Sequence, residues 1–388
     1  MINEQTWNFI HQHAADDVRK LALQGTKDAD VDLSMALQQI AGQQTALRKL
    51  PSWAAVEGIF YPPHLNMEQC SSEQTARYKA QLAGSGDAYV DLTGGLGVDF
   101  YWMSQGFKQR SYVERNADLC TLAEHNFHTL GHSCSVCCCD TATYIKDMPH
   151  ADVVFLDPAR RNEHGGRTYD IKDCTPNIIE LLPLLMEKAS KVILKLSPML
   201  DWRKAVDDLQ HVREVHIVSV DNECKELLLV LEQVERPLRL VCVNNDQIFE
   251  APERKQFATP HSTLQRIAPN YLYEPNASIM KAGCFEALMQ QYPVCQVSVN
   301  SHLFLSAVEI EDFPGRRFQI CAISSTNKQV LKETLAGISR ANITVRNFPM
   351  SVEQLHKKLH LKDGGDTYIF ATTEANGAHS LYICRKIG

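Results

Sequence analysis

Between residues 88 and 231, short apolar runs alternate with segments of helical periodicity. Seven strands are expected, at residues 88–92, 111–113, 135–139, 153–156, 192–196, 215–220 and 227–231. Four helices are expected between them, near residues 98–104, 117–130, 177–189 and 202–209. Because strands that alternate with helices form mostly parallel, doubly wound sheets, we expect a Rossmann-like α/β domain over residues 81–235. The polar link 221–223 predicts that the last two strands form an antiparallel hairpin at the sheet edge.

The flanking regions have different patterns, and 388 residues exceed what one ordinary core holds. Residues 1–80 are expected to be largely helical, with Ser71 or Ser72 capping a helix that runs through Lys79. Residues 236–388 are expected to be α+β. Strands are predicted there at residues 239–243, 296–299, 318–322, 367–371 and 381–384, and helices at 276–290 and 328–336.

Composition limits the class of protein. Hydrophobic residues make up 44% and charged residues 22% of the chain, as in globular proteins. No apolar run approaches the roughly 18 residues of a membrane helix, and the N-terminus lacks a signal-peptide pattern. The 13 cysteines have irregular spacing, which is typical of reduced thiols. We therefore expect a cytoplasmic protein without a membrane partner.

The glycine-rich turn that follows the first predicted strand indicates a ligand site. It runs from Asp91 through Thr93, Gly95 and Gly97, and it has neither the third glycine of a dinucleotide site nor the lysine of a P-loop. A carboxylate at Asp91 would repel a pyrophosphate but would suit an ammonium group, such as that of S-adenosylmethionine. We expect all four residues to contribute to binding this cofactor.

Two further acids follow the next strands. Glu114 lies about 20 residues beyond the glycine turn, where a carboxylate can accept both hydroxyls of a ribose. Asp140 follows the third strand, where an acid can meet the adenine amino group. Acids at the ends of three neighbouring strands predict a nucleoside pocket. The alternative is that they are ordinary solvated acids, above all Asp140 and the nearby Asp99.

The end of the fourth strand carries Asp157, which could contact the cofactor, hydrogen-bond a substrate or act as a base. Arg160, Arg161 and Arg167 follow it and form a local cationic group that could hold phosphates. Such a local group would be needed for nucleic-acid binding, because the net charge of the chain is −7. The alternative for this segment is a solvated loop.

Two lysines and two acids are expected to converge at the strand ends. Lys195 ends the fifth strand inside an apolar run, where a lysine needs a partner. Together with Lys79, Asp157 and Glu226 it could deprotonate a ribose hydroxyl, the lysines lowering the pKa of the nucleophile. The alternative is a structural ion pair between Lys195 and one nearby acid.

We expect no metal site. Cys137, Cys138 and Cys139 are consecutive on a predicted strand, so their side chains point to alternating faces and cannot all ligate one ion. His125, His128 and His132 lie on or just beyond a helix that is expected to pack against the sheet.

Several of these motifs together resemble a family. Residues 65–79, 91–99, 114–116 and 156–161 are similar to the bacterial class I methyltransferases with a THUMP-like C-terminal domain, as are residues 273–276 and 346–368. The resemblance spans roughly residues 55–388. It implies S-adenosylmethionine as cofactor, a ferredoxin-like module over 236–320 and a THUMP-like module over 321–388. Because THUMP domains bind RNA, it also implies a tRNA or rRNA substrate.

Two departures from related patterns bear on the chemistry. Thr93 stands where class I enzymes commonly have glycine. Asp157, Pro158, Ala159 and Arg160 replace the Asp/Asn-Pro-Pro-Tyr/Phe motif of enzymes that methylate exocyclic amines, so the aromatic residue that would stack on a flipped base is absent. A ring nitrogen, a ring carbon or a ribose oxygen stays open as the acceptor.

The leading hypothesis is methyl transfer from S-adenosylmethionine to structured RNA, with Asp157 and Lys195 at the reacting centre and Lys79 with the arginines near the substrate. Two alternatives are a methyltransferase of a protein or small molecule, and a non-catalytic RNA-binding protein with a methyltransferase fold. The target nucleotide, the methylated atom and the oligomeric state do not follow from the sequence.

Overall fold

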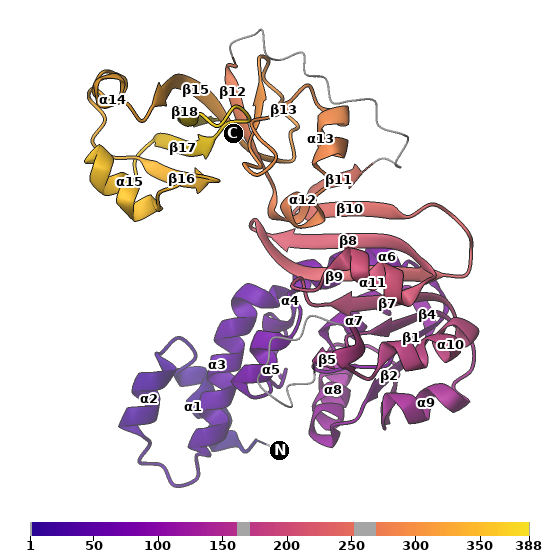
Figure 1. Cartoon of the computed structure of the whole chain (residues 1–388). Helices are drawn as coiled ribbons and strands as arrows, with labels where there is room; N and C mark the ends of the chain where they lie inside the picture. Colours follow the sequence, from indigo (N-terminus) through magenta and orange to yellow (C-terminus); the bar gives the residue numbers. More distant parts are fainter. Residues whose placement is uncertain (1, 161–170, 252–268, 388) are drawn as a thin grey trace. The chain divides into compact units, whose positions relative to one another are not determined.

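The computed structural model describes residues 2–160, 171–251 and 269–387 (Figure 1). The chain divides into two compact units. The first comprises Met1–Val215 and Glu226–Arg236, and the second comprises His216–Lys225 and Pro237–Gly388. Within the described ranges, no helix is both long and apolar enough to cross a membrane.

Six helices precede the first strand, which agrees with the helical character expected for this region. They are α1 (Glu4–Gln12), α2 (Val18–Gln24), α3 (Leu33–Lys49), α4 (Pro51–Ala54), α5 (His64–Gln69) and α6 (Glu73–Ala83). Side chains that cap exposed backbone N–H groups define where α1, α2, α3 and α6 begin, and Ser72 is the cap of α6. Trp53 on α4 and Met67 on α5 pack in one apolar cluster with Leu96 and Val98, so these two helices are attached to the glycine turn.

The sheet of the first unit has the order β8-β9-β7-β4-β1-β2-β3. Its strands are β1 (Gly86–Asp91), β2 (Phe107–Glu114), β3 (Ser135–Cys138), β4 (Ala151–Leu156), β7 (Ala189–Leu196), β8 (Val212–Val220, of which Val212–Val215 lie in this unit) and β9 (Glu223–Glu232). The pairs of β1, β2, β3, β4 and β7 are parallel, whereas β7 and β9 are antiparallel. All seven predicted strands are confirmed. The last two predicted strands are neighbours, as expected of a hairpin, but they do not lie at the sheet edge, because the order continues beyond β8 with β10 (Arg239–Asn244) and β11 (Gln247–Ala251).

Helices cover both faces of this sheet. One face carries Tyr89, Phe155 and Ile193, which pack with residues of α6, α7 (Val98–Met103) and α8 (Ala117–Thr129). Figure 1 shows α9 (Thr141–Asp147), α10 (Ile178–Lys188) and α11 (Trp202–Leu209) together on one side of the sheet. The predicted helices are confirmed to within a few residues, and α9 was not expected. Short elements β5 (Ala159–Arg160), η1 (Ile171–Asp173) and β6 (Cys174–Thr175) lie between β4 and α10.

The second unit is α+β, as expected. Its main sheet has the order β13-β14-β12-β15-β18-β17-β16. These strands are β12 (Tyr271–Pro275), β13 (Cys295–Gln296), β14 (Phe304–Ser306), β15 (Gly315–Ser325), β16 (Asn342–Arg346), β17 (Thr367–Thr373) and β18 (His379–Ile387). A hairpin of β10 (Arg239–Asn244) and β11 (Gln247–Ala251) precedes them, and the helices are α12 (Ala277–Ala282), α13 (Phe285–Gln291), α14 (Lys328–Thr334) and α15 (Val352–Leu359).

Several predictions for this unit need correction. The single helix expected at 276–290 is two helices, because Gly283 at the end of α12 has a left-handed φ of 64°. The strand expected at 296–299 is shorter, since β13 ends at Gln296. Strands β11, β12, β14 and β16 were not expected, because runs of five residues or fewer carry little periodicity. Helix α15 was missed although Val352, Leu355 and Leu359 have helical spacing and Ser351 with Gln354 forms a capping box.

Candidate active site

The glycine turn joins β1 to α7 at the carboxyl end of β1, an interior strand of the sheet. Gly95 and Gly97 have positive φ values of 55° and 84°. A Cβ atom on Gly97 would lie 2.6 Å from Phe127 Cζ, and one on Gly94 would lie 2.1 Å from Tyr112 Cε2. At Gly95 the nearest atom would be Thr93 O, 3.8 Å away. Gly94 and Gly97 are therefore required by packing, whereas space remains beside Gly95.

Asp91 ends β1 and is buried. Its Oδ1 accepts a hydrogen bond of 2.9 Å from the backbone N–H of Thr93. Its Oδ2 is buried without a hydrogen-bond partner among the described residues. Burial raises the pKa of Asp91 well above its ordinary value, and the bond from Thr93 opposes this shift only in part. A cationic group placed against Oδ2 would supply the missing partner.

Glu114 ends β2 and faces the same turn. Its Oε2 accepts a bond of 3.0 Å from the N–H of Gly95, and its Oε1 accepts one of 2.9 Å from the N–H of Asn116. The hydroxyl of Tyr112 donates to the carbonyl of Gly95 at 2.5 Å. These bonds hold the turn against β2, so the carboxylates of Asp91 and Glu114 lie on neighbouring parallel strands at one edge of the sheet.

Asp140 and Thr93 have local roles in the structure. Asp140 is the N-cap of α9, where its Oδ1 accepts a bond of 2.8 Å from the N–H of Ala142. Thr93 Oγ1 accepts a bond of 2.6 Å from the N–H of Asp157, so it joins the ends of β1 and β4. Asp140 therefore remains exposed at the end of β3, and Thr93 lies between the turn and Asp157.

The arginine segment is only partly described. The backbone of Arg160 belongs to β5, which pairs with β6. Arg161 and Arg167 lie outside the described residues. The predicted role of these three residues in phosphate binding stays a prediction.

The two lysines and their acids do converge. Lys79, on α6, is fully buried at 0% exposure. Its Nζ lies 2.5 Å from Glu226 Oε2 on β9 and 3.1 Å from Asp99 Oδ1 on α7. Its Nζ also lies 3.1 Å from Ser71 Oγ. The predicted convergence of Lys79 and Glu226 is therefore present.

Asp99 links this buried pair to the strand-end pair. Its Oδ2 lies 3.4 Å from Lys195 Nζ, and Lys195 Nζ lies 2.5 Å from Asp157 Oδ2. The side chains of Lys195 and Asp157 are 12% and 39% exposed. One continuous chain of charges thus runs from buried Glu226 to partly exposed Asp157. We call these five residues, Lys79, Asp99, Asp157, Lys195 and Glu226, the charge cluster.

The charges of the cluster shift the pKa values of its members. Burial alone would lower the pKa of Lys195, but the surrounding carboxylates, Asp157 foremost, raise it well above its ordinary value. Burial would raise the pKa of Asp99, but Lys79 and Lys195 lower it overall. For Asp157 the desolvation prevails over the attraction of Lys195, so its pKa is raised. At neutral pH the lysine is therefore protonated, while Asp157 binds a proton more readily than an ordinary aspartate.

The sequence did not predict that Asp99 and Ser71 belong to this network. Asp99 was treated as a residue that could be an ordinary solvated acid, but it is buried between the two lysines. Ser71 was considered only as a cap, but its hydroxyl contacts Asp99 Oδ2 at 2.7 Å and Glu226 Oε1 at 3.2 Å. The available signal for Asp99 was an acid within the apolar run of α7.

The cysteines and histidines near this site do not form a metal centre in the described ranges, where no cluster of three or more ligating residues was found. His132 packs in the core with its Nε2 2.8 Å from Ser104 Oγ. Burial lowers the pKa of His132 to about 4.

The chain is similar to two domain families and to solved methyltransferase structures. Residues 271–314 match the family model of a ferredoxin-like domain, and residues 315–386 match a THUMP domain-like model. The crystal structure of a candidate methyltransferase from Porphyromonas gingivalis W83 matches all of this chain over its own full length, with 29% sequence identity and a TM-score of 0.84. The chain has a methyltransferase fold with ferredoxin-like and THUMP-like domains.

Two further solved structures each match part of this chain. A class I S-adenosylmethionine-dependent methyltransferase candidate from Listeria monocytogenes covers 62% of this chain and 93% of its own, with 10% identity and a TM-score of 0.39. An RNA methyltransferase candidate from Pyrococcus horikoshii covers 48% of this chain and 97% of its own, with 16% identity and a TM-score of 0.35. No curated protein matches the chain.

Proposed function

We propose that the protein is an S-adenosylmethionine-dependent methyltransferase that acts on structured RNA. The observation that carries this proposal is the edge of the parallel sheet, where β1 leads into a glycine turn held by Glu114 and the Oδ2 of buried Asp91 has no hydrogen-bond partner among the described residues. Carboxyl ends of parallel strands are where doubly wound sheets bind ligands. An orphaned buried carboxylate oxygen fits the ammonium of an amino acid, and this supports the cofactor.

The residues around the turn would divide the cofactor between them. Asp91 would pair with the ammonium, and Glu114 would accept the ribose hydroxyls with lone pairs not used by backbone N–H groups. The open side of Gly95 would allow close approach, and Asp140 would meet the adenine amino group. When bound, the cofactor supplies an activated methyl group on sulfur. The protein would therefore contribute mainly alignment of the acceptor with that methyl group.

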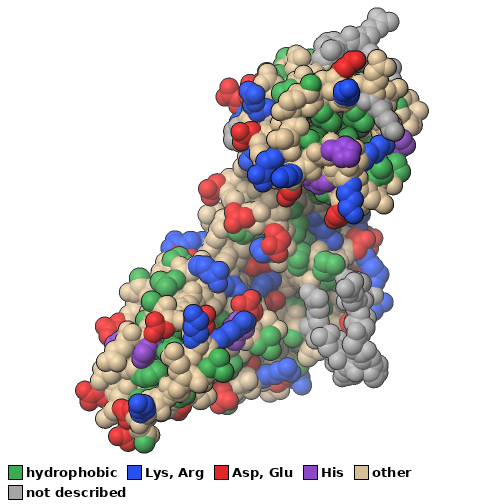
Figure 2. Space-filling model, turned by 90° about the vertical axis from the view of Figure 1, so that its left-hand side faces the viewer, with side chains coloured by type: hydrophobic (Ala, Val, Ile, Leu, Met, Phe, Trp, Pro, Cys, Tyr) green, Lys and Arg blue, Asp and Glu red, His purple; other side chains and the backbone are tan. Residues whose placement is uncertain are grey.

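RNA as the substrate rests on the C-terminal domain. THUMP domains bind RNA, and the THUMP domain-like match spans residues 315–386. The net charge of −7 means that phosphate contacts have to be local. On the face shown in Figure 2, Lys and Arg side chains are interspersed with Asp and Glu, without a region dominated by one sign. We expect Arg160, Arg161 and Arg167 to contribute such local contacts beside Asp157.

Titration calorimetry with S-adenosylmethionine tests the cofactor, and transfer of a labelled methyl group to total RNA from cells that lack the gene tests the substrate. We expect saturable binding and incorporation into RNA. Absence of binding would overturn the enzymatic function and favour a non-catalytic RNA-binding protein. Binding with incorporation only into protein or small molecules would overturn the RNA substrate.

A further inference from the structure

We propose that the atom that accepts the methyl group is a ribose 2′-hydroxyl oxygen of the RNA, contacted by Lys195 and Asp157. This inference rests on the proposed function and deepens it. Its basis is the charge cluster, which places a protonated amine and a carboxylate 2.5 Å apart where β4 and β7 end. These parallel strands are neighbours in the sheet, and β4 also adjoins β1, which leads into the glycine turn.

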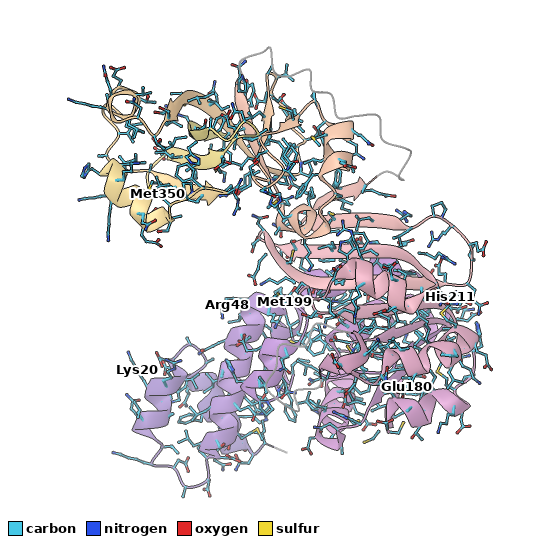
Figure 3. The ribbon with its side chains drawn as sticks, in the orientation of Figure 1. Lys20, Arg48, Glu180, Met199, His211 and Met350 are labelled. Atoms are coloured by element: carbon cyan, nitrogen blue, oxygen red, sulfur yellow. The ribbon has the colours of Figure 1, made fainter. Side chains whose placement is uncertain are left out.

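The burial of the cluster shows which of its members can meet a substrate. Lys79, Asp99 and Glu226 are buried, whereas Asp157 remains 39% exposed. Lys195, at 12% exposure, lies between the buried members and Asp157. A substrate can therefore reach only the Lys195–Asp157 end. The loop that follows this end of β7 contains Met199, which is exposed (Figure 3).

The buried members act as positioning residues. Lys79 is held by Glu226, Ser71 and Asp99, and Asp99 in turn contacts Lys195. Burying so many charges is costly, and a hydrophobic replacement would often be at least as stable. The arrangement has a chemical use, because it fixes the direction of the Lys195 ammonium and keeps that ammonium protonated.

A hydroxyl acceptor needs this pair, whereas a ring nitrogen without a proton, such as N7 of guanine or N1 of adenine, does not. Such a nitrogen attacks with a free lone pair, but a hydroxyl becomes a strong nucleophile only when it loses its proton. Asp157 has a raised pKa and suits the base, while the Lys195 ammonium would stabilise the negative charge that develops on oxygen. The segment Asp157-Pro158-Ala159 carries no aromatic residue to stack on a flipped base, which also argues against an exocyclic amine.

The O–H bond breaks as the proton passes to the Asp157 carboxylate, and the oxygen forms a bond to the methyl carbon. The carbon–sulfur bond breaks, its electron pair stays on sulfur, and the cofactor product leaves as a neutral thioether. The proton on Asp157 is then released to water, which restores the carboxylate for the next turnover.

Digestion of the methylated RNA to nucleosides, followed by mass spectrometry, identifies the acceptor. We expect the label in 2′-O-methylnucleosides, with the added mass on the ribose fragment. Label on the base fragment would overturn the hydroxyl acceptor while leaving the RNA methyltransferase in place. No incorporation into RNA, despite binding of S-adenosylmethionine, would overturn the RNA function itself.

Variants of Lys195 test its role with readouts other than the loss of activity. We expect K195M to lower kcat by about 10²–10³-fold, the typical cost of removing a group that stabilises an oxyanion. Its affinity for S-adenosylmethionine in calorimetry should stay unchanged. K195R keeps the positive charge and should lose less. K191M is the matched control, because Lys191 lies on the same strand and its Nζ donates to the Leu82 carbonyl instead.

The pH profile separates a catalytic lysine from a structural one. In K195M the methylation rate should rise more steeply with pH than in the wild type. Without the Lys195 ammonium the deprotonated hydroxyl is less stable, so its formation depends more strongly on the hydroxide concentration. Nitrogen-15 NMR of the lysine amines should show a Lys195 signal that titrates above ordinary lysine and moves to lower pH in D157N. Parallel pH profiles, together with a Lys195 signal that D157N leaves unmoved, would overturn the assignment.

Discussion

The ammonium of Lys79 lies 2.5 Å from the carboxylate of Glu226, although 147 positions separate the two residues in the chain. Both side chains are almost fully buried. Replacing Lys79 by methionine would leave Glu226 and Asp99 as buried carboxylates without this partner. We expect K79M to lower the free energy of unfolding of the first unit by about 3–5 kcal/mol, measured by chemical denaturation.

Two further variants test whether the unpaired buried carboxylates cause this loss of stability. The double variant K79M/E226Q should recover part of the lost stability, since it removes one unpaired charge. Lys108 and Asp87 form a pair at a similar distance, 2.6 Å, but on the surface. K108M should therefore leave stability nearly unchanged. An equal loss in K79M and K108M would contradict the importance of burial.

Asp91 is expected to make stability depend on pH. Its folded pKa is raised, so the folded state retains a proton that the unfolded state loses near pH 4. The wild type should therefore lose stability as pH rises from about 4 through the folded pKa of Asp91, by about 1.4 kcal/mol for each unit between the two pKa values. D91N lacks this titration. Denaturation curves at several pH values should show its stability relative to wild type increasing with pH.

Binding of S-adenosylmethionine should also distinguish the wild type from D91N. Its ammonium would partner the buried Oδ2, so the cofactor should raise the melting temperature of the wild type more than that of D91N. Equal shifts in the two proteins would contradict the pairing of Asp91 with the ammonium, and parallel pH dependences of stability would contradict the raised pKa of Asp91.

Glu114 is expected to govern cofactor affinity. E114A removes the predicted ribose acceptor and also the bond to Gly95 N–H, which shapes the turn. Because hydrogen bonds to charged groups contribute about 1.5–3 kcal/mol, the Kd for S-adenosylmethionine in calorimetry should rise at least tenfold. E114Q keeps an acceptor oxygen and should be intermediate. Glu124 is an exposed acid on α8, so an unchanged Kd is expected for E124A.

Gly97 should tolerate no side chain. Its φ is 84°, and an added Cβ would lie 2.6 Å from Phe127 Cζ. Strain and overpacking together should make G97A less stable by about 2 kcal/mol or more in thermal or chemical unfolding. Gly25 has a φ of 69° with nothing within 4 Å of an added Cβ, so G25A measures the backbone cost alone. If G97A were no worse than G25A, the contact with Phe127 would not be the cause.

The strands and most helices of the first unit follow from the sequence, because hydrophobic periodicity and caps are local. The apolar runs at β1, β4 and β7 and the glycine turn predicted a parallel sheet with acids along one edge. The second unit was harder to predict, because β14 spans only Phe304–Ser306 and the helices α12 and α13 are separated by a single turn at Gly283. The family matches, not periodicity, resolve its ferredoxin-like and THUMP-like parts.

By itself, the sequence determined which chemical groups are available at the strand ends: Asp91, Glu114, Asp157 and the two lysines. Only the tertiary structure decided that Asp99 joins Lys79 to Lys195 and that Ser71 belongs to the same network. The physical reason is the separation along the chain of the residues that interact. Turns and periodicity depend on neighbours a few residues apart, whereas ion pairs form between α6, α7, β7 and β9 once the sheet has brought them together.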